Sequence, residues 1–357
     1  MPHLLVDISA HGYGHVAQTA PVLNELKRLL PELRITVRSA APHSLLQQRI
    51  HGSFQHLPLA FDFGMRMANA VDVQVEESAA AYREFHADWA RKVEREAEAM
   101  AQLTPDLLLA NVPYLSLAAA KKAGVRAVGM CCLNWADIYN HYCVHDAASR
   151  AIHAQMLEAY NSAECFLRVQ PTMPMPDFAN VRGINPIAQL GRQQRARMAQ
   201  LCTLENGEKL VLVAMGGLEF RLPMEHWPHL PGVHWLVPQV WGIRRDDVTA
   251  FETLGLSFSD ALASSDAVLT KPGYGTFAEA ACAGVPVLYV TRRDWPEEPY
   301  LVRWLGLNGV CMEVGREALL AGELDALLQR LWAQAAPPRP HATGASEAAK
   351  YLLDNYF

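Results

Sequence analysis

The sequence predicts an α/β fold in which two Rossmann-like domains face each other across a cleft, with a C-terminal helix after them. Short β-rich runs alternate with longer helical runs, as in folds built on parallel sheets. This alternation occurs twice, and 357 residues are more than one core of ordinary size needs. These observations predict two domains of the same class.

The first half of the chain holds the strands and helices of the first predicted domain. β-rich runs predict strands at 3–9, 34–40, 54–60, 107–112 and 126–133. Helix-forming runs predict helices at 16–30, 43–50, 76–103, 114–123 and 146–160. The longest of these helices has a charged face and ends before Pro105, which cannot continue a helix. We expect the N-terminal Rossmann-like domain to span residues 1–165.

The second half repeats the pattern after a stretch rich in Pro, Gly and Asn, residues 166–205, which predicts a connecting segment. Strands are predicted at 209–215, 232–239, 267–270 and 285–290, and helices at 275–283 and 298–305. The run "AAPPRPHATG" predicts a flexible link before a last helix, "ASEAAKYLLDNYF". The C-terminal Rossmann-like domain is therefore expected at 206–335, and the linker with the terminal helix at 336–357.

Composition and charge exclude several classes of protein. The chain is 51% apolar and 19% charged, as soluble globular proteins are. Its net charge of −6 lacks the basic excess of a nucleic-acid-binding surface, so we expect no nucleic-acid partner. Its apolar runs are shorter than the ~20 residues that span a bilayer, and its start does not resemble a secretory signal. Seven cysteines without a CxxC spacing fit a reducing compartment. We expect a cytoplasmic monomer or homodimer with at most peripheral membrane contact.

The first loop, "HGYGH" at residues 11–15, follows the first predicted strand. Ligands of parallel sheets bind beyond the carboxyl ends of the strands. Gly12 and Gly14 would let the backbone approach a ligand, and the N–H groups of the next helix favour an oxyanion. His11 and His15 are candidate bases near neutral pH, unless both only pack or cap the turn. The loop lacks the GxGxxG spacing of dinucleotide-binding enzymes, which argues against a dehydrogenase.

A second loop, "KPGYGT" at residues 271–276, follows the predicted strand 267–270. Thr276 stands at the predicted helix start, and Glu279 follows it at the spacing of a capping box. Lys271 and the backbone from Gly273 to Thr276 could hold a diphosphate at this helix start. Glu279 could accept hydrogen bonds from ribose hydroxyls. The loop therefore predicts a nucleotide site.

Two further loops are expected at the same edge of the second sheet. Gly216 and Gly217 follow the predicted strand 209–215. The strand 285–290 leads into "TRRDWPEEP", whose charged side chains include Arg292, Asp294, Glu297 and Glu298. Because the carboxyl ends of parallel strands meet at one edge, we expect the loops to converge on one site. Ordinary capped turns would explain any one of them alone.

The stretch "SDAVLTKPGYGTFAEAACAGVPVLYV" (265–290) resembles the donor-binding region of GT-B glycosyltransferases. That fold family includes the lipid-linked N-acetylglucosaminyltransferase of peptidoglycan synthesis, and "HGYGH" resembles its glycine-rich first loop. A closer likeness is to the glycosyltransferase-like segment at the N-terminus of L-arabinokinases, through "KPGYGT" and "RRDWPEEP". "AFDFGMRM" (60–67) and "LNWADIYNHY" (133–142) also resemble segments of that group. The likeness covers residues 3–315.

The resemblance implies a GT-B fold and assigns roles to the loops. A nucleotide diphosphate would be held by Gly216, Gly217, Lys271, Gly273, Tyr274, Gly275, Thr276 and Glu279. The donor sugar would lie against Arg292, Asp294, Glu297 and Glu298, with Glu298 where such enzymes use an acid or amide. The N-terminal domain would face the acceptor, with His15 as base. Since uridine is the commonest base among relatives, the resemblance implies a UDP-sugar donor.

The resemblance also implies a mechanism. No Asp-x-Asp motif stands at a predicted strand end, so the leaving diphosphate would be neutralised by backbone donors, a helix dipole and basic side chains. We therefore expect no metal and no cofactor other than the donor substrate. Direct attack by an acceptor hydroxyl would invert the anomeric centre. His15 is the first choice of base, followed by Asp62 and His11.

Other residues leave alternatives open. The acceptor would be lined by Trp135, Asp137 and Tyr139, unless these residues form an aromatic packing cluster. "HYCVH" sets His141 and His145 four residues apart with Cys143 between them, which suits a metal on a helix face or an ordinary packed face. Besides a transferase, we consider a non-catalytic nucleotide-sugar sensor and a sugar-nucleotide epimerase or hydrolase that uses Glu297 and Glu298.

Overall fold

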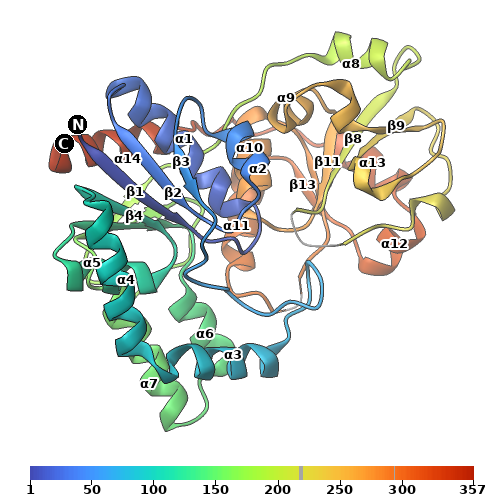
Figure 1. Cartoon of the computed structure of the whole chain (residues 1–357). Helices are drawn as coiled ribbons and strands as arrows, with labels where there is room; N and C mark the ends of the chain where they lie inside the picture. Colours follow the sequence, from blue (N-terminus) through green and yellow to red (C-terminus); the bar gives the residue numbers. More distant parts are fainter. Residues whose placement is uncertain (217–219, 293) are drawn as a thin grey trace. The chain divides into compact units, whose positions relative to one another are not determined.

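The chain divides into two compact units, each built on a parallel sheet (Figure 1). The computed structural model describes residues 1–216, 220–292 and 294–357. The first unit contains residues 1–68, 73–187 and 343–357, and the second contains 69–72 and 188–342. The α/β class and the parallel sheets expected from the sequence are confirmed.

The sheet of the first unit has the order β3-β2-β1-β4-β5-β6-β7, and each pair of neighbouring strands is parallel. Its strands are β1 (His3–Ile8), β2 (Arg34–Arg38), β3 (Gln55–Leu57), β4 (Leu107–Asn111), β5 (Ala127–Cys131), β6 (Cys165–Val169) and β7 (Val181–Ile184). β1 and β4 are buried along their whole length, as expected where helices cover both faces of a parallel sheet. All strands predicted in the first half of the sequence are present.

Helices connect these strands. They are α1 (Gly14–Leu29), α2 (His43–Arg49), α3 (Val75–Ala87), α4 (Trp89–Leu103), α5 (Tyr114–Ala123), α6 (Trp135–Cys143), α7 (Ala147–Tyr160) and, at the end of the chain, α14 (Gly344–Tyr356). The single helix predicted at 76–103 was wrong, because the chain turns at Asp88, whose φ of −116° and ψ of 38° are not helical. The hydrophobic pattern continues through this turn, so it gave no sign of the break.

The second unit has a sheet of order β10-β9-β8-β11-β12-β13, again parallel throughout. Its strands are β8 (Lys209–Ala214), β9 (Val233–Val237), β10 (Val248–Ala250), β11 (Ala267–Thr270), β12 (Val287–Tyr289) and β13 (Cys311–Glu313). Its α-helices are α8 (Arg195–Leu201), α9 (Phe258–Ala263), α10 (Tyr274–Ala283), α11 (Glu298–Asn308), α12 (Arg316–Ala321) and α13 (Asp325–Trp332). The core of this unit includes Val211, Trp235, Leu269 and Leu288.

The stretch 166–205 differs from the connecting segment that its composition predicts. Most of β6 and all of β7 lie in it and extend the first sheet. Each strand is at most five residues long and is flanked by Pro, Gly or Asn, so its β pattern is weak in the sequence. The first unit therefore continues to residue 187 before the second begins.

The terminal helix α14 belongs to the first unit and packs against α1 (Figure 1). Asn185 fixes its first turn, because its backbone N–H donates to Glu347 (3.0 Å) and its side-chain amide donates to Glu347 (2.7 Å) and Thr343 (3.0 Å). The backbone also comes close at Gly344, where a Cβ atom would lie 2.0 Å from the Asn185 carbonyl oxygen. In the described chain, no helix is both long and apolar enough to cross a membrane.

Candidate active site

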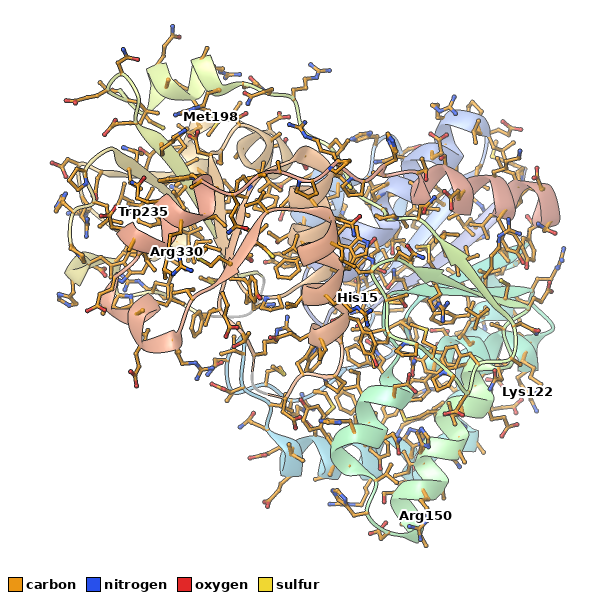
Figure 2. All side chains as sticks on the ribbon, turned by 180° about the vertical axis from the view of Figure 1, so that it is seen from behind. His15, Lys122, Arg150, Met198, Trp235 and Arg330 are labelled. Carbon is orange, nitrogen blue, oxygen red and sulfur yellow. The ribbon has the colours of Figure 1, made fainter. Side chains whose placement is uncertain are left out.

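The first loop connects β1 to α1 at the carboxyl edge of the first sheet. Gly12 adopts a φ of +83°, which favours glycine, and α1 begins at Gly14 without a side-chain cap on its first turn. His15 is the second residue of this helix and is 5% exposed (Figure 2). The predicted loop and the predicted position of His15 after the first strand are therefore present.

His15 is held by a residue from the neighbouring strand. Its Nδ1 atom lies 2.8 Å from Oδ1 of Asn111, the last residue of β4, which pairs with Ile8 at the end of β1. Because an amide oxygen only accepts hydrogen bonds, Nδ1 carries the proton of the neutral imidazole. The lone pair is then on Nε2, the atom that can act as a base.

A thiol also lies against the imidazole. Sγ of Cys131, at the end of β5, is 3.7 Å from Nδ1 of His15. Burial alone would lower the pKa of His15, but Cys131, Asn111 and Asp62 raise it to about 9. Burial would raise the pKa of Cys131, but the Cys132 thiol and His15 lower it to about 6. The raised pKa favours the cationic form of His15, and the lowered pKa favours the thiolate form of Cys131.

Asp62 and His11, the other candidate bases, lie together with His15 around the side chain of Trp135. The Trp135 indole N–H donates to Oδ2 of Asp62 at 2.7 Å. The Trp135 ring lies 5.1 Å from the His11 ring, edge to face, and 5.9 Å from the His15 ring. Burial raises the pKa of Asp62 above its ordinary value, against the effects of His15, Trp135 and Ser9. The structure therefore brings the three predicted bases together.

His11 is also packed from the loop that carries Asp62. A Cβ atom on Gly64 would lie 2.7 Å from the His11 ring and from Trp135, so only glycine fits there with this arrangement. The imidazole of His11 thus packs against this loop and against Trp135, which is the packing role considered for it from the sequence. Its part in catalysis stays a prediction.

The residues expected on the acceptor side lie on α6. Asn134 caps this helix by accepting from the Asp137 N–H at 2.8 Å and donates to Oδ2 of Asp137 at 2.9 Å. Tyr139 is 1% exposed and packs on Tyr82 with ring centroids 4.7 Å apart. Asp137 is thus hydrogen-bonded to the capping residue Asn134, and Tyr139 is a packing residue, whereas an acceptor-side role for either stays a prediction.

In the second unit, two of the expected nucleotide-binding loops lie side by side. Gly216, after β8, has a φ of +84°, and a Cβ atom there would lie 3.3 Å from Cε of Lys271, which follows β11. A Cβ atom on Gly273 would lie 3.8 Å from Nζ of the same lysine. Burial lowers the pKa of Lys271 well below its ordinary value, helped by Arg292 and opposed by Glu297 and Glu298. Gly217 lies outside the described residues.

The capping box predicted at Thr276 was wrong. Helix α10 begins two residues earlier, at Tyr274, and its N-cap residue is Gly273, which makes no side-chain cap. Because glycine offers no side-chain acceptor, Gly273 gives no side-chain cap to the first turn, which includes the N–H groups of Gly275 and Thr276. Glu279 lies in the second turn and is 2% exposed, so little of it is open to a ribose.

The "TRRDWPEEP" loop brings charged side chains together before α11. Oε2 of Glu298 accepts from the Arg292 backbone N–H at 2.9 Å, and Oε2 of Glu297 accepts from the Trp295 indole N–H at 3.1 Å. The Arg292 guanidinium lies 5.1 Å from the centre of the Trp295 ring. Burial raises the pKa of Glu298 to about 7, although Arg292 and Lys271 oppose it. Asp294 is exposed.

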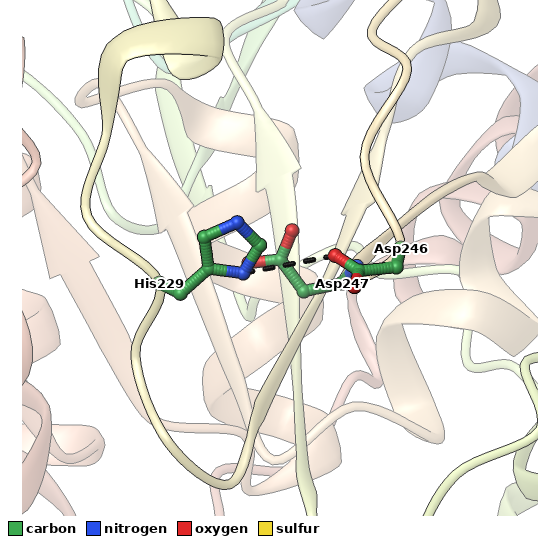
Figure 3. A group of neighbouring side chains, drawn as sticks. All are labelled: His229, Asp246 and Asp247. Atoms are coloured by element: carbon green, nitrogen blue, oxygen red, sulfur yellow. Dashed lines mark hydrogen bonds and ion pairs between the residues drawn. The ribbon is translucent and has the colours of Figure 1, made fainter.

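Among the described residues, one group could offer three ligand atoms to a metal ion: His229, Asp246 and Asp247 (Figure 3). Asp247 is already paired with Arg245 through two contacts of 2.8 and 2.6 Å. His229 and Asp246 are largely exposed. Asp246 and Asp247 lie in a turn, and His229 and Asp246 are in contact with solvent. The histidines of "HYCVH", His141 and His145, are exposed, whereas Cys143 is buried, so these side chains do not share one environment.

Two residues of the first site were missing from the sequence-based prediction, Asn111 and Cys131. Both stand at the end of apolar strands, in "LLLAN" and "AVGMC", and read as core or turn residues. One signal was available in the sequence, the polar residue Asn111 at the carboxyl end of an apolar strand. That strand, β4, pairs with β1, which precedes "HGYGH".

Comparison with known proteins supports this architecture. No family model matches the chain. It is 25% identical over 336 residues to L-arabinokinase from Arabidopsis thaliana; the match covers 90% of this chain and 31% of the relative. The chain thus spans about a third of the length of that protein.

Solved glycosyltransferases have the same fold. The calicheamicin glycosyltransferase CalG4 is 15% identical, with a TM-score of 0.60 and coverage of 99% of this chain and 94% of CalG4. UGT2 from Phytolacca americana, solved with UDP-2-fluoro-glucose and pterostilbene, is 14% identical, with a TM-score of 0.56 and coverage of 100% and 95%. The chain therefore has the GT-B glycosyltransferase fold, as the resemblance implied. Likeness to the peptidoglycan enzyme stays a prediction.

Proposed function

We propose that the protein is a glycosyltransferase that moves a sugar from a nucleotide diphosphate, with inversion, to a hydroxyl acceptor. The observation that carries this proposal is the setting of His15. Its Nδ1 proton is fixed by Asn111 at the carboxyl edge of a parallel sheet, which directs the basic Nε2 atom away from that bond. The GT-B neighbours support sugar transfer as the reaction class.

The second unit would bind the donor. The first turn of α10, whose N-cap residue Gly273 makes no side-chain cap, and the amino group of Lys271 would hold the diphosphate, whose negative charge favours the protonated amine. Glu298, half neutral near its pKa of about 7, would contact the sugar hydroxyls. These groups would stabilise the charge that develops on the leaving diphosphate, so we infer that no metal is needed.

The first unit would supply the base. Nε2 of His15 would take the proton of an acceptor hydroxyl as its oxygen attacks the anomeric carbon. The bond from that carbon to the diphosphate oxygen breaks, and the nucleoside diphosphate leaves. A single displacement of this kind inverts the anomeric centre. General-base help of this type contributes about 10²–10⁴-fold to the rate.

We infer a UDP-sugar as donor, since UGT2 from Phytolacca americana binds UDP-2-fluoro-glucose in the same fold. One observation favours a second function: the relative in sequence is a sugar kinase that is about three times as long as the match. In this alternative the GT-B fold senses a nucleotide sugar and transfers nothing. A third reading, an epimerase or hydrolase using Glu297 and Glu298, would consume donor without any acceptor.

A thermal-shift panel tests the donor site. Uridine, guanosine, thymidine, adenosine and cytidine diphosphates are added singly, free and as sugar conjugates. Ligand at about 100 times its dissociation constant adds about 2.7 kcal/mol, which raises the unfolding midpoint by several degrees. A rise with uridine diphosphate and its sugars, followed by acceptor-dependent release of that nucleotide, supports the transferase. Nucleotide binding without acceptor-dependent release of the nucleotide favours the sensor. An unchanged unfolding midpoint with every nucleotide contradicts both the transferase and the sensor.

A further inference from the structure

A buried polar network lies behind His15, on the side away from Nε2. The Gln18 amide donates to Sγ of Cys132 at 2.9 Å, and the Asn111 amide donates to the Gln18 carbonyl at 3.3 Å. Asn111 in turn accepts from His15. These side chains and Cys131 are 5% exposed or less. The displacement described above makes no use of Cys131.

The position of Cys131 decides what its sulfur can do. Nδ1 of His15 already carries a proton, because Asn111 presents a carbonyl oxygen to it at 2.8 Å. Sγ of Cys131, 3.7 Å from the same nitrogen, is therefore a second acceptor facing that N–H. A thiolate at this position accepts the Nδ1–H hydrogen bond more strongly than a neutral thiol, because its negative charge strengthens the bond.

Asp62, like Cys131, raises the pKa of His15. The titratable groups that raise the pKa of His15 include Cys131 from β5 and Asp62 from the loop after β3. The His11 ring also packs on Trp135, with ring centroids 5.1 Å apart, compared with 5.9 Å for His15. The pKa of His15 is raised to about 9 and that of Cys131 is lowered to about 6, so imidazolium and thiolate coexist between these values.

We propose that Cys131 is a positioning residue that holds His15 as an imidazolium near neutral pH and makes it a stronger base once that proton is lost. This inference rests on the proposed transferase function. In mildly alkaline solution, Nε2 releases its proton to water and leaves a neutral imidazole beside the thiolate. The acceptor hydroxyl then gives its proton to Nε2, and the imidazolium–thiolate pair forms again. No electron changes hands.

The titration of His15 in the ligand-free protein tests this pairing without any substrate. Proteins with isotope-labelled histidine are titrated by NMR, and His15→Gln identifies the resonance. We expect the midpoint of His15 to fall by about two pH units in Cys131→Ser, because an opposite charge within ~4–6 Å moves a pKa by 1–3 units. Cys202→Ser, which removes a buried thiol of α8 in the second unit, should leave the midpoint unchanged. An unmoved midpoint in Cys131→Ser overturns the proposal.

A second measurement covers the case in which Cys131→Ser fails to fold. The ultraviolet absorbance of thiolate is followed in the unaltered protein as the pH is lowered. We expect one thiolate to persist down to about pH 6. Its absence from the mildly acidic range would overturn the proposal. Burial raises the pKa of the Cys143, Cys202 and Cys282 thiols, so these thiols would not supply the signal.

Transfer assays separate this inference from the proposed function. In an active enzyme, the rise of kcat/KM with pH should occur near the His15 midpoint and move to lower pH in Cys131→Ser. A moved NMR midpoint in a protein that transfers no sugar supports the pairing and contradicts the transferase. Transfer with a midpoint that Cys131→Ser leaves unmoved contradicts the pairing and supports the transferase.

Discussion

Nδ1 of His15 and Oδ1 of Asn111 lie 2.8 Å apart, across two neighbouring strands of the first sheet. β1 and β4 are adjacent although about a hundred residues separate them, so the loop after one meets the last residue of the other. The sheet itself therefore fixes the tautomer and the direction of the imidazole. This arrangement is the physical basis of the proposed base.

Asn111→Leu removes the acceptor of the Nδ1 proton and keeps much of the side-chain volume. We expect kcat to fall by about 10–100-fold, since a hydrogen bond to a group that becomes charged contributes about 1.5–3 kcal/mol. Nucleotide affinity, measured by calorimetry, should stay the same. Asn111→Asp keeps an acceptor oxygen and should retain most of the rate; an equal loss in both variants would make Asn111 a packing residue only.

Lys271→Met tests the amino group proposed to hold the diphosphate in the donor site. The ammonium group is replaced by an apolar one of similar length, so the diphosphate loses a charged donor. We expect nucleoside diphosphate to bind about 10–100-fold more weakly in calorimetry. The matched control is Lys209→Met. Lys209 is the first residue of β8, and it pairs with Asp266 at 3.2 Å. Equal affinities in the wild type and Lys271→Met would contradict the assignment.

Glu96 makes the stability of the first unit depend on pH. Its carboxylate is paired with Arg38, which also binds Asp7 through two contacts of 2.7 and 2.6 Å. Burial raises the pKa of Glu96 from 4.5 to about 7, although Arg38 opposes the change. The folded state therefore binds this proton more tightly than the unfolded state, and the stability gained below about 4.5 is lost as the pH rises through about 7.

Denaturant unfolding of wild type and Glu96→Gln across this pH range measures the effect. The free energy of unfolding of the wild type should decline relative to that of Glu96→Gln by on the order of 1–3 kcal/mol. A constant difference between the two proteins would show that the pKa of Glu96 is the same in the folded and unfolded states. Arg38→Met should destabilise the protein by about 3–5 kcal/mol at neutral pH, because two carboxylates then remain buried without their partner.

Gly344 tests how α14 is attached to the first unit. Gly→Ala within a helix ordinarily stabilises it by about 0.5–1 kcal/mol. At Gly344 the new Cβ atom would meet the Asn185 carbonyl oxygen at 2.0 Å, so we expect a loss of about 1–3 kcal/mol instead. Gly306→Ala in α11 is the control, since a Cβ atom there meets nothing within 4 Å. Thermal unfolding should move in opposite directions in the two variants.

Most of the fold could be predicted from the sequence, because long apolar strands and amphipathic helices leave clear periodic patterns. The strands β10 and β13 were not predicted, although β3 and β12, which are equally short, were found within longer β-rich runs. The helix break at Asp88 was also hidden, because no Gly or Pro marks it. The start of α10 was placed two residues late because Thr276 and Glu279 have the spacing of a cap, whereas Gly273 performs that role without a side chain.

The candidate site could be predicted only in part, for a different physical reason. His15 and Lys271 stand beside glycine-rich turns, and Glu298 follows a charged segment, so local sequence signals a polar function at all three. Asn111 and Cys131 act through contacts with a residue about a hundred positions away. Such contacts depend on the order of strands in the sheet, which one sequence does not specify.

His15→Ala removes the base that we propose for sugar transfer. Transfer from a UDP-sugar to phenolic or sugar hydroxyls is followed by release of UDP, and UDP affinity is measured on the same preparations. We expect kcat to fall by about 10²–10⁴-fold while the dissociation constant of UDP stays unchanged. Transfer at the wild-type rate by the folded His15→Ala protein would contradict the account.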